Sequence, residues 1–364
     1  MIENLGQGGA ERQLIGLSCM LKDNGYPVRL ITYHDDSFYK HILDEYGVEN
    51  EYVSRAQSKF RRIPTLIRYI RSYKPDVVVA YLSVPCITAC IAKMLGGKFR
   101  LIVSERNTTQ TLSFRERVKF HFYRYADIIV PNSHSQTRFL QENYPAFAGK
   151  IRTITNFVDT QMFCPEEKLK VDHPCQFVCA ARIAPQKNIL RFLDAIAILK
   201  DKEYSFHIDW FGLKDEGYYA ECERKRKELG IKDYISFHDA VVDILSEYHK
   251  ADALILPSLY EGFPNVACEA MSCGLPVLCS DICDNREIVR DKVNGLLFDP
   301  SSATEMAAAI EWFIKMPEEG KKKMSQLSRQ FALEDFSKKV FYNKYIDLIE
   351  YAVNSNRKIP RENN

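Results

Sequence analysis

Two glutamates bracket a turn in the segment EGFPNVACE, at positions 261 and 269. Pro264 suits the first position of a helix, and Gly274 followed by Pro276 suits its end, so a short helix is predicted here. Unpaired backbone N–H groups at the start of such a helix can bind phosphates or sugar hydroxyls. A carboxylate can accept hydrogen bonds from two neighbouring hydroxyls. Glu261 and Glu269 could therefore hold a ribose and a hexose on either side of a diphosphate.

Two cations lie in a second segment, RIAPQKNIL, directly after the apolar run FVCAA. Asn188 suits the N-cap of a helix that continues to Leu199, so Arg182 and Lys187 are expected in a loop between a strand and a helix. Two fixed cations there could neutralise a departing nucleotide diphosphate without a metal ion. Solvated surface charges are the ordinary alternative, and the nearby glutamate motif favours the functional interpretation.

A glycine-rich turn near the start, GQGG at residues 6–9, leads into a helix predicted to begin near Ala10. Gly8 and Gly9 would let a ligand approach the backbone N–H groups at that helix terminus. The spacing is not G-x-G-x-x-G, so dinucleotide binding is disfavoured. A plain tight turn remains the alternative.

Polar residues also follow two predicted strands of the first half. Glu105, Arg106 and Asn107 end one strand, and Asn156 follows the run RTIT. Ligands bind at the carboxyl ends of parallel strands, so these four are candidates for the acceptor side of a site. A buried Glu105–Arg106 salt bridge, and a simple turn role for Asn156, are the structural alternatives.

No metal-binding pattern accompanies these residues. The eight histidines show neither H-x3-H nor H-E-x-x-H spacing, and no Asp-x-Asp is present. The carboxylate pair that usually anchors a catalytic divalent cation is therefore missing, and we expect no metal and no cofactor. The sequence also has no P-loop and no G-x-S-x-G motif.

Bulk composition narrows the class of protein. A chain of 364 residues exceeds the size of one ordinary core, so two domains are expected. Charge is nearly balanced, with 50 Lys+Arg against 48 Asp+Glu, which gives no reason to expect nucleic acid as a partner. None of the 11 cysteines forms a C-x2-C pair, which favours reduced core cysteines and a cytoplasmic protein. No apolar run of about 18 residues and no signal peptide are recognisable.

Apolar β-rich runs alternate with helical patterns, which is typical of α/β domains with parallel sheets. Strands are predicted at 28–32, 77–81, 101–104, 128–131 and 152–155, and then at 177–181, 207–211, 235–237, 253–256, 277–280 and 295–298. The polar segment 164–174 is the predicted linker. We expect a first Rossmann-like domain at 1–163, a second at 175–335, and a C-terminal helix with a polar tail at 336–364 that could return to the first domain.

The opening of the chain has only Met1-Ile2-Glu3 before the glycine turn, although such a turn normally follows a whole strand. The first strand is therefore expected to be incomplete, with the true start upstream. A longer version that is markedly more soluble and heat-stable would support this expectation, and equal behaviour would contradict it.

Together the segments GQGGAER, NFVDTQMF, ARIAPQKN and PSLYEGFPNVACEAMSCGLPVLCSD resemble retaining glycosyltransferase family four, whose GT-B fold has two doubly wound domains facing a central cleft. The resemblance covers nearly the whole chain. It implies that Arg182 and Lys187 bind the donor diphosphate, that Glu269 binds the nucleotide ribose, and that Glu261 contacts the transferred sugar.

The same resemblance implies further donor contacts. Backbone N–H groups around Gly262 and Phe263, next to Pro264, would hold sugar or phosphate, and Asn265 could select the sugar. Gly8 and Gly9 would lie under the donor from the first domain. Arg182, Lys187, Glu261 and Arg106 are thus the expected catalytic set.

One departure from the family pattern concerns the loop after the strand at 101–104. Many relatives have a histidine there, whereas this chain has SERNTT, as a subset of polysaccharide-assembling relatives does. Arg106 or Asn107 could take that role. The departing phosphate itself could also act as the base.

Two segments mix cations with aromatic residues, RAQSKFRRIPTLIRYIRSYK and FRERVKFHFYRY. Such stretches are typical of surfaces that bind anionic membranes, and a charged, solvated helix face is the ordinary alternative. Because the family often builds surface polysaccharides on polyprenyl-diphosphate carriers, we expect a lipid-linked acceptor and a peripheral position on the inner face of the cytoplasmic membrane.

The sequence therefore predicts a metal-independent, retaining glycosyltransferase that uses a nucleotide diphosphate sugar, UDP-sugar being favoured, and a glycan acceptor. A sugar-nucleotide epimerase of similar architecture is one alternative, and a donor-only incubation that yields an epimer would favour it. An inactive sugar-nucleotide-binding subunit is the other, and it would bind nucleotide without transfer or hydrolysis.

Overall fold

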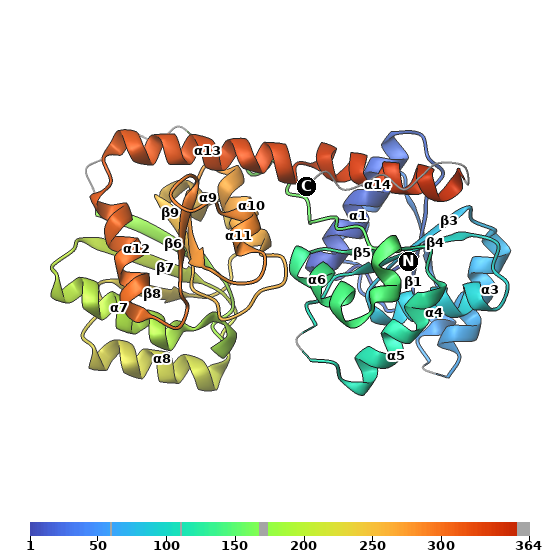
Figure 1. Cartoon of the computed structure of the whole chain (residues 1–364), viewed down its shortest axis with the longest axis horizontal. Coiled ribbons are helices and arrows are strands. Elements are labelled where there is room, and N and C mark those ends of the chain that lie inside the picture. Colours follow the sequence, from blue (N-terminus) through green and yellow to red (C-terminus); the bar gives the residue numbers. More distant parts are fainter. Residues whose placement is uncertain (59, 110, 167–173, 355–364) are drawn as a thin grey trace. The chain divides into compact units, whose positions relative to one another are not determined.

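A computed structural model describes residues 1–58, 60–109, 111–166 and 174–354. By its internal contacts the chain divides into two compact units. The first unit comprises Met1–Phe157 and the chain from Lys339 onward, and the second comprises Val158–Lys338. Figure 1 labels many of the helices and strands of both units.

The first unit is an α/β domain with parallel strands. Its strands are β1 (Arg29–Thr32), β2 (Glu49–Tyr52), β3 (Val77–Tyr81), β4 (Arg100–Glu105) and β5 (Ile128–Pro131). Its helices are α1 (Gly9–Asp23), α2 (Lys40–Glu45), α3 (Arg62–Tyr73), α4 (Ser83–Met94), α5 (Phe114–Phe122), α6 (His134–Asn143) and nearly all of α14 (Lys338–Val353), with short 3₁₀ turns at Ser54–Ala56, Tyr123–Tyr125 and Pro145–Lys150.

Residues 1–3 lie between two sheets, β1-β2 and β3-β4-β5, and hydrogen-bond to both. The Ile2 N–H donates to the Ile31 oxygen at 3.1 Å, and the Tyr81 N–H donates to the Met1 oxygen at 3.0 Å. This short segment occupies the place of the predicted first strand. Counting it as strand one, the order across the unit is 3-2-1-4-5-6, that of a Rossmann-like domain.

Two details of the first unit differ from the sequence-based expectation. The predicted strand at 152–155 is wrong as an element: Arg152 and Ile154 donate backbone hydrogen bonds to β5, and Ile151 forms a single bridge with Ile129, but no strand is present there. Strand β2 was not predicted because its sequence ENEY is polar and its residues are largely accessible to solvent.

The second unit is also an α/β domain. Its strands are β6 (Cys175–Ala180), β7 (Phe206–Phe211), β8 (Ile235–His238), β9 (Ala253–Leu256), β10 (Val277–Ser280) and β11 (Gly295–Phe298). Its helices are α7 (Ile189–Asp201), α8 (Glu216–Glu228), α9 (Leu245–Lys250), α10 (Asn265–Ser272), α11 (Asn285–Ile288), α12 (Ala303–Lys315) and α13 (Glu318–Phe336), with a 3₁₀ turn at Pro185–Lys187. All six strands are parallel, in the order β11-β10-β9-β6-β7-β8. Two Rossmann-like domains are thereby confirmed.

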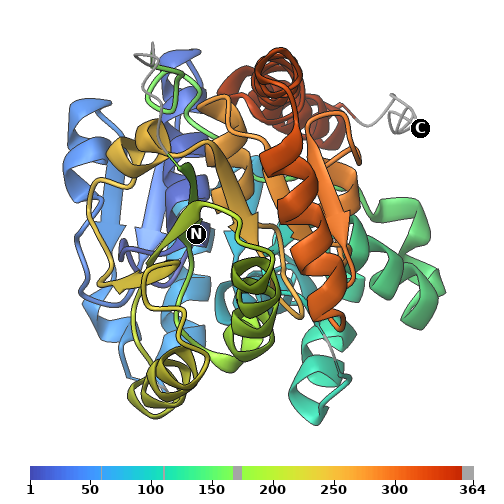
Figure 2. The ribbon, with the colours of Figure 1, turned by 90° about the vertical axis from the view of Figure 1, so that its left-hand side faces the viewer.

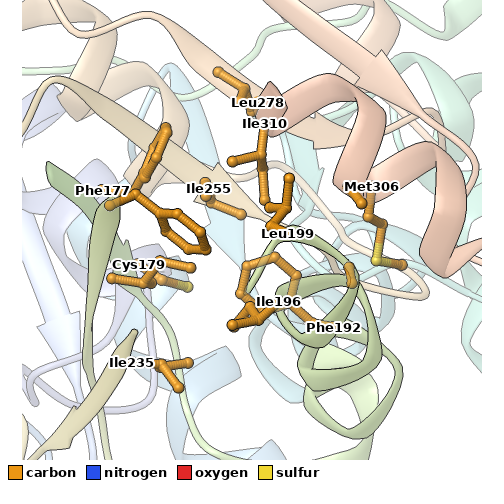
Figure 3. Packing of buried hydrophobic residues seen from close by; sticks show 14 of the residues in the cluster. Phe177, Cys179, Phe192, Ile196, Leu199, Ile235, Ile255, Leu278, Met306 and Ile310 are labelled. Carbon is orange, nitrogen blue, oxygen red and sulfur yellow. The ribbon is translucent and has the colours of Figure 1, made fainter. Parts of the chain in front are cut away.

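Alternate residues along the strands of the second unit feed two cores, one on each face of its sheet. Phe177 and Cys179 of β6 pack with Phe192 of α7 and Met306 of α12, as Figure 3 shows. Val178, between them in sequence, packs in the opposite core, which includes residues of α10 and α13. Helices α7, α8 and α12 lie in front of the sheet in Figure 2. Burial on both faces explains the continuous apolar strands.

The contact-based division differs in detail from the predicted domain boundaries. Val158 and Phe163 pack in the core of the second unit, and the Val158 N–H donates to the Phe336 oxygen at 2.8 Å. Most of the predicted linker, 167–173, lies outside the described residues. Helix α14 returns to the first unit, where Tyr345 and Tyr81 join their hydroxyls at 2.6 Å.

One cluster on β7 and β8 predicts a pH dependence of stability. Asp209 accepts from His238 at 2.7 Å, and its carboxylate lies 3.6 Å from His207 Nε2. The attraction between Asp209 and His207 raises the pKa of His207 above 6.5 and lowers the pKa of Asp209 below 3.8. The His207 contribution is complete below pH 6.5 and is lost as pH rises through the raised pKa, whereas the Asp209 contribution is lost as pH falls through its lowered pKa. The cluster therefore stabilises the fold most between about pH 4 and 6.5.

We expect the free energy of unfolding to fall above pH 6.5 by less than about 1 kcal/mol from this source, because the side chains are partly exposed. Asp209→Asn should remove that slope, and the exposed Asp201→Asn should keep it. Urea titrations at pH 6 and pH 8 measure the difference. Equal slopes in wild type and Asp209→Asn would contradict the assignment.

Candidate functional site

The strand order of the second unit brings two predicted loops together. Strands β6 and β9 are neighbours in the sheet. From β6 the chain continues outward through β7 to β8 on one side, and from β9 it continues through β10 to β11 on the other. Ligands of doubly wound domains bind at the carboxyl ends of the strands at such a switch point. The loop 181–188 follows β6, and the loop 257–264 follows β9. Both predicted donor motifs of the second half therefore lie at this one place.

Hydrogen bonds join the two loops directly. The Leu259 N–H donates to the Gln186 oxygen at 2.9 Å, and the Gln186 side chain donates to the Tyr260 oxygen at 2.8 Å. Asn188 is buried and donates to the oxygens of Pro257 at 3.1 Å and Pro300 at 2.8 Å. Asn188 is the N-cap residue of α7, as predicted, but its side chain ties loops together and makes no capping hydrogen bond.

Asn188→Ala should lower the free energy of unfolding by about 2 kcal/mol, because two carbonyls lose their donor and alanine is strained in the left-handed conformation. The backbone there has φ 59°. Asn188→Gly keeps the backbone relaxed, so it should show only the hydrogen-bond part of the loss. Urea unfolding of both variants measures this, and a wild-type midpoint for Asn188→Ala would contradict it.

The centre of the arrangement is an ion pair between the two motifs. Lys187 Nζ lies 2.5 Å from Glu261 Oε1, and the Ser258 hydroxyl donates to the same oxygen at 2.5 Å. The side chains of Lys187 and Glu261 are only 14% and 10% exposed. Partial burial strengthens their attraction and fixes both groups before any ligand arrives.

This pair leaves hydrogen-bonding capacity for a ligand. A lysine ammonium has three protons, so Lys187 can donate to Glu261 and to a phosphate oxygen together. Arg182, in the same loop, is exposed, and it has no hydrogen-bond or ion-pair partner within the described ranges. The two cations and one carboxylate are thus available to an anionic, hydroxyl-rich ligand.

Helix α10 begins one residue later than predicted. Pro264 is its N-cap and Asn265 its first residue, because the Pro264 oxygen already accepts from Ala267 and Cys268. Gly274, with φ 80°, follows the helix as expected. Over the described part of the chain, the N–H groups of Gly262 and Phe263 have no acceptor. Such groups before a helix start can donate to an anion.

Glu269 lies on α10 and is buried, with 5% of its surface exposed. Glu261 lies in the loop that precedes this helix, and Glu269 lies within the helix. The roles predicted for Glu269 in ribose binding and for Asn265 in sugar selection stay predictions.

In the first unit, two of the four acceptor-side candidates are brought together. The guanidinium of Arg106 donates to the Asn156 side-chain oxygen, and both residues are buried. Arg106 also lies 4.7 Å over the ring of Tyr81. Asn107, the next residue, is exposed. Arg106 and Asn156 therefore form one hydrogen-bonded pair.

Glu105 is placed in the core and does not pair with Arg106. Its carboxylate lies 2.9 Å from Lys119 Nζ and accepts from the Tyr123 hydroxyl at 3.1 Å. Burial raises the pKa of Glu105, while Lys119 and Tyr123 act in the opposite direction. Glu105 is 2% exposed, and its carboxylate is engaged by these two partners. The acceptor contact predicted for it stays a prediction. Lys119, from the cationic segment FRERVKFHFYRY, is likewise buried.

The glycine turn of the first unit has the predicted local form. Gly8 is the N-cap of α1 and Gly9 its first residue. A Cβ added at Gly8 would come within 1.9 Å of a Glu11 carboxylate oxygen, so the turn is closely packed. The donor contacts predicted for Gly8 and Gly9 stay predictions. Among the described residues, no group of three His, Cys, Asp or Glu side chains is arranged to hold a metal ion.

Ser258 and Gln186 were not among the predicted site residues. Ser258 contacts the predicted Glu261, whereas Gln186 contacts Leu259 and Tyr260, which precede Glu261 in the same loop. Ser258 precedes Glu261 by three residues in the motif PSLYEGFP, and this spacing could have predicted a hydrogen bond from the hydroxyl to the carboxylate. No local pattern could have predicted the contact of Gln186, because its partner lies in a loop 74 residues away.

Family models match both halves of the chain. Residues 7–162 match Glycosyltransferase Family 4, and residues 164–331 match Glycosyl transferases group 1. A relative from Campylobacter jejuni, N-acetylgalactosamine-N,N'-diacetylbacillosaminyl-diphospho-undecaprenol 4-alpha-N-acetylgalactosaminyltransferase, is 25% identical over 335 residues, which cover 86% of this chain and 89% of the relative. Lipopolysaccharide 1,6-galactosyltransferase of Escherichia coli is 24% identical over 264 residues, 70% of each chain.

Solved structures show the same fold. A glycosyltransferase from Rickettsia africae superposes with a TM-score of 0.84 at 17% identity, covering 98% of both chains. Anabaena HepE in complex with UDP superposes with a TM-score of 0.83 at 19% identity, covering 96% of this chain and 98% of HepE. With two Rossmann-like domains of this topology and both family models matched, the chain belongs to the GT-B glycosyltransferases, its first half to glycosyltransferase family 4 and its second half to glycosyl transferases group 1.

Proposed function

We propose that this glycosyltransferase is retaining and metal-independent, and that it moves a sugar from a UDP-sugar to a polyprenyl-diphosphate-linked glycan during assembly of a bacterial surface polysaccharide. The observation that carries the proposal is the Lys187–Glu261–Ser258 cluster at the switch point of the second unit. It offers a cation to a diphosphate and a carboxylate to sugar hydroxyls.

In the proposed reaction an acceptor hydroxyl oxygen bonds to the anomeric carbon as the bond from that carbon to the β-phosphate oxygen breaks. The hydroxyl proton passes to the departing phosphate, and UDP and the new glycoside are the products. Lys187 and Arg182 stabilise the charge that grows on the leaving diphosphate, which is where fixed cations accelerate such a step. Glu261 orients the transferred sugar through its hydroxyls.

The choice of substrates rests on the relatives. The Campylobacter relative is named for a diphospho-undecaprenol acceptor, and the Escherichia coli relative for lipopolysaccharide. Structures of Anabaena HepE contain UDP, glucose with UDP, or UDP-glucose. These names favour UDP as the nucleotide and a lipid-linked acceptor. Both family models describe glycosyltransferases, which gives no support to an epimerase.

A peripheral membrane position is part of the proposal. Along α3, the residues Leu66, Ile67 and Ile70 are buried, whereas Arg68 and Arg71 are exposed. Phe60, just before α3, is 96% exposed, and Phe114 at the start of α5 is 81% exposed. Exposed aromatic and cationic residues favour anionic lipid surfaces. Within the described residues, every helix is too short or too polar to cross a bilayer.

Turnover with a UDP-sugar and a prenyl-diphosphate-linked acceptor, in the presence of EDTA, tests the reaction. NMR of the product should show the donor's anomeric configuration retained, and EDTA should leave the rate unchanged. Inversion of the anomeric centre would overturn the retaining mechanism, and loss of rate in EDTA would overturn metal independence. Formation of UDP without a glycoside product would overturn the proposal that the acceptor is a prenyl-diphosphate-linked glycan.

Flotation with anionic vesicles tests the membrane position. The wild type should float at low salt, and replacing Phe60 and Arg68 together by alanine and glutamate should reduce flotation without changing UDP binding. Absence of the wild type from the vesicle fraction at low salt would remove this part of the proposal.

A further inference from the structure

Arg106 is a buried cation whose contacts within the described residues are all to neutral groups. It is 8% exposed and follows the end of β4. One guanidinium nitrogen donates to the Ser104 hydroxyl at 3.3 Å, and another donates to the Asn156 side-chain oxygen. The third, Nε, is buried and has no hydrogen-bond partner. The remaining contact is the ring of Tyr81, 4.7 Å below the guanidinium.

The positive charge of Arg106 lacks a compensating negative charge within the described residues. Guanidinium stays protonated in proteins, so burial cannot neutralise it. A buried charge is unfavourable unless an opposite charge and hydrogen bonds compensate it. Across the described residues Arg106 has no ion pair with a carboxylate, and its sequence neighbour Glu105 is already paired with Lys119.

A second buried cation of the same domain, Lys119, is compensated by carboxylates. Lys119 is 3% exposed and pairs with Glu105 at 2.9 Å and Glu116 at 2.5 Å. Partly buried cations without a carboxylate donate instead to backbone carbonyls, as Lys150 and Arg329 do. Within the described residues Arg106 has neither a carboxylate nor a backbone carbonyl as partner, and it lies at the carboxyl edge of a parallel sheet, where ligands bind.

We propose that Arg106 is the receptor for a phosphate group of a substrate. The planar guanidinium matches two phosphate oxygens, and it has more N–H donors than its contacts to Ser104 and Asn156 use. Tyr81 and Asn156 hold the plane in position. The inference rests on the proposed function, which supplies two sources of phosphate: the diphosphate of a lipid-linked acceptor and the diphosphate of the nucleotide donor.

Binding measurements on Arg106→Gln distinguish the two sources. Wild type and variant are titrated calorimetrically with UDP and, separately, with farnesyl diphosphate in the presence of saturating UDP. A rise of roughly ten- to a hundredfold in the Kd for farnesyl diphosphate, with the Kd for UDP unchanged, assigns the acceptor phosphate. A similar rise for UDP assigns the donor phosphate. The Kd of Arg106→Lys should lie between those of wild type and Arg106→Gln, because lysine keeps the charge but loses the planar geometry that matches two phosphate oxygens.

A steady-state assay gives an independent readout. Two acceptors with the same sugar are compared, one on a prenyl diphosphate and one on a phosphate-free octyl group. If Arg106 binds the acceptor phosphate, Arg106→Gln raises KM only for the first. If it binds the donor phosphate, both acceptors are affected alike through the donor. The exposed Arg29, paired with Glu49 at 2.5 Å, provides the matched control Arg29→Gln, which should behave as wild type.

Asn156→Asp separates ligand binding from a purely structural role. It gives Arg106 a carboxylate partner, so it should raise the melting temperature and weaken phosphate binding together. A raised melting temperature with unchanged phosphate binding would overturn the proposal. So would unchanged Kd values for both phosphates in Arg106→Gln, or absence of binding by the wild type. Failure of the proposed function is a different result: no transfer by the wild type, whatever Arg106 binds.

Discussion

Lys187→Ala should lower the rate of sugar transfer about a hundredfold, a loss on the order of 3 kcal/mol of transition-state stabilisation. Lys187 Nζ lies 2.5 Å from Glu261 and is held there with only 14% of the side chain exposed. Its removal takes a fixed cation from the leaving diphosphate and also leaves the Glu261 carboxylate without its ion-pair partner. Initial rates at saturating donor measure the effect on kcat.

Two further variants make this prediction specific. Lys202 lies in the same unit, is 51% exposed and pairs with Glu311 at 2.6 Å, so Lys202→Ala should keep wild-type turnover. Lys187→Arg should recover part of the rate because it keeps the charge. Circular dichroism and a melting curve would show that Lys187→Ala is folded. A folded Lys187→Ala with near wild-type kcat would remove Lys187 from the catalytic set.

Gly212→Ala should destabilise the second unit by about 1–3 kcal/mol and also reduce transfer. A Cβ at Gly212 would lie 2.0 Å from the backbone oxygen of Ala181, far inside contact distance. Ala181 directly precedes Arg182, and its N–H donates to the Phe211 oxygen at 2.9 Å. Relief of the clash must therefore move the loop that bears the proposed donor cations. Urea unfolding and transfer rates measure the two effects.

Gly217→Ala is the matched control in the same unit. The closest atom to its added Cβ is an Asp215 carboxylate oxygen at 3.8 Å, and Gly217 lies in α8. Alanine should stabilise that helix by about 0.5–1 kcal/mol. Equal stability of Gly212→Ala and Gly217→Ala would contradict the close approach at Gly212.

Much of the second unit was predictable because its buried strands are short apolar runs. Strands β9, β10 and β11 have their predicted bounds, and β6, β7 and β8 are within two residues of them. The polar edge strand β2 has no such signal. Pro264 was predicted one position too far into α10, since proline suits both the N-cap region and the first turn, and local sequence does not decide between them.

The partners of charged residues were harder to predict than the residues themselves. Lys187 and Glu261 were both predicted, but they are 74 residues apart, and only the pairing of β6 with β9 brings them together. Glu105 was expected to face an acceptor or pair with Arg106. It pairs instead with Lys119, because α5 packs that lysine into the core of the first unit. Such pairings depend on tertiary packing, which a local pattern does not contain.

Isothermal titration of UDP into wild type and Lys187→Ala, both with EDTA, shows whether the Lys187–Glu261 cluster binds the donor. We expect metal-free binding of one UDP to the wild type and an affinity at least roughly tenfold weaker in Lys187→Ala, the loss expected when a charge-assisted hydrogen bond is removed. GDP and ADP serve as comparison ligands. Equal UDP affinity in both proteins, or no UDP binding by the wild type, would contradict the assignment of the Lys187–Glu261 cluster as the donor site.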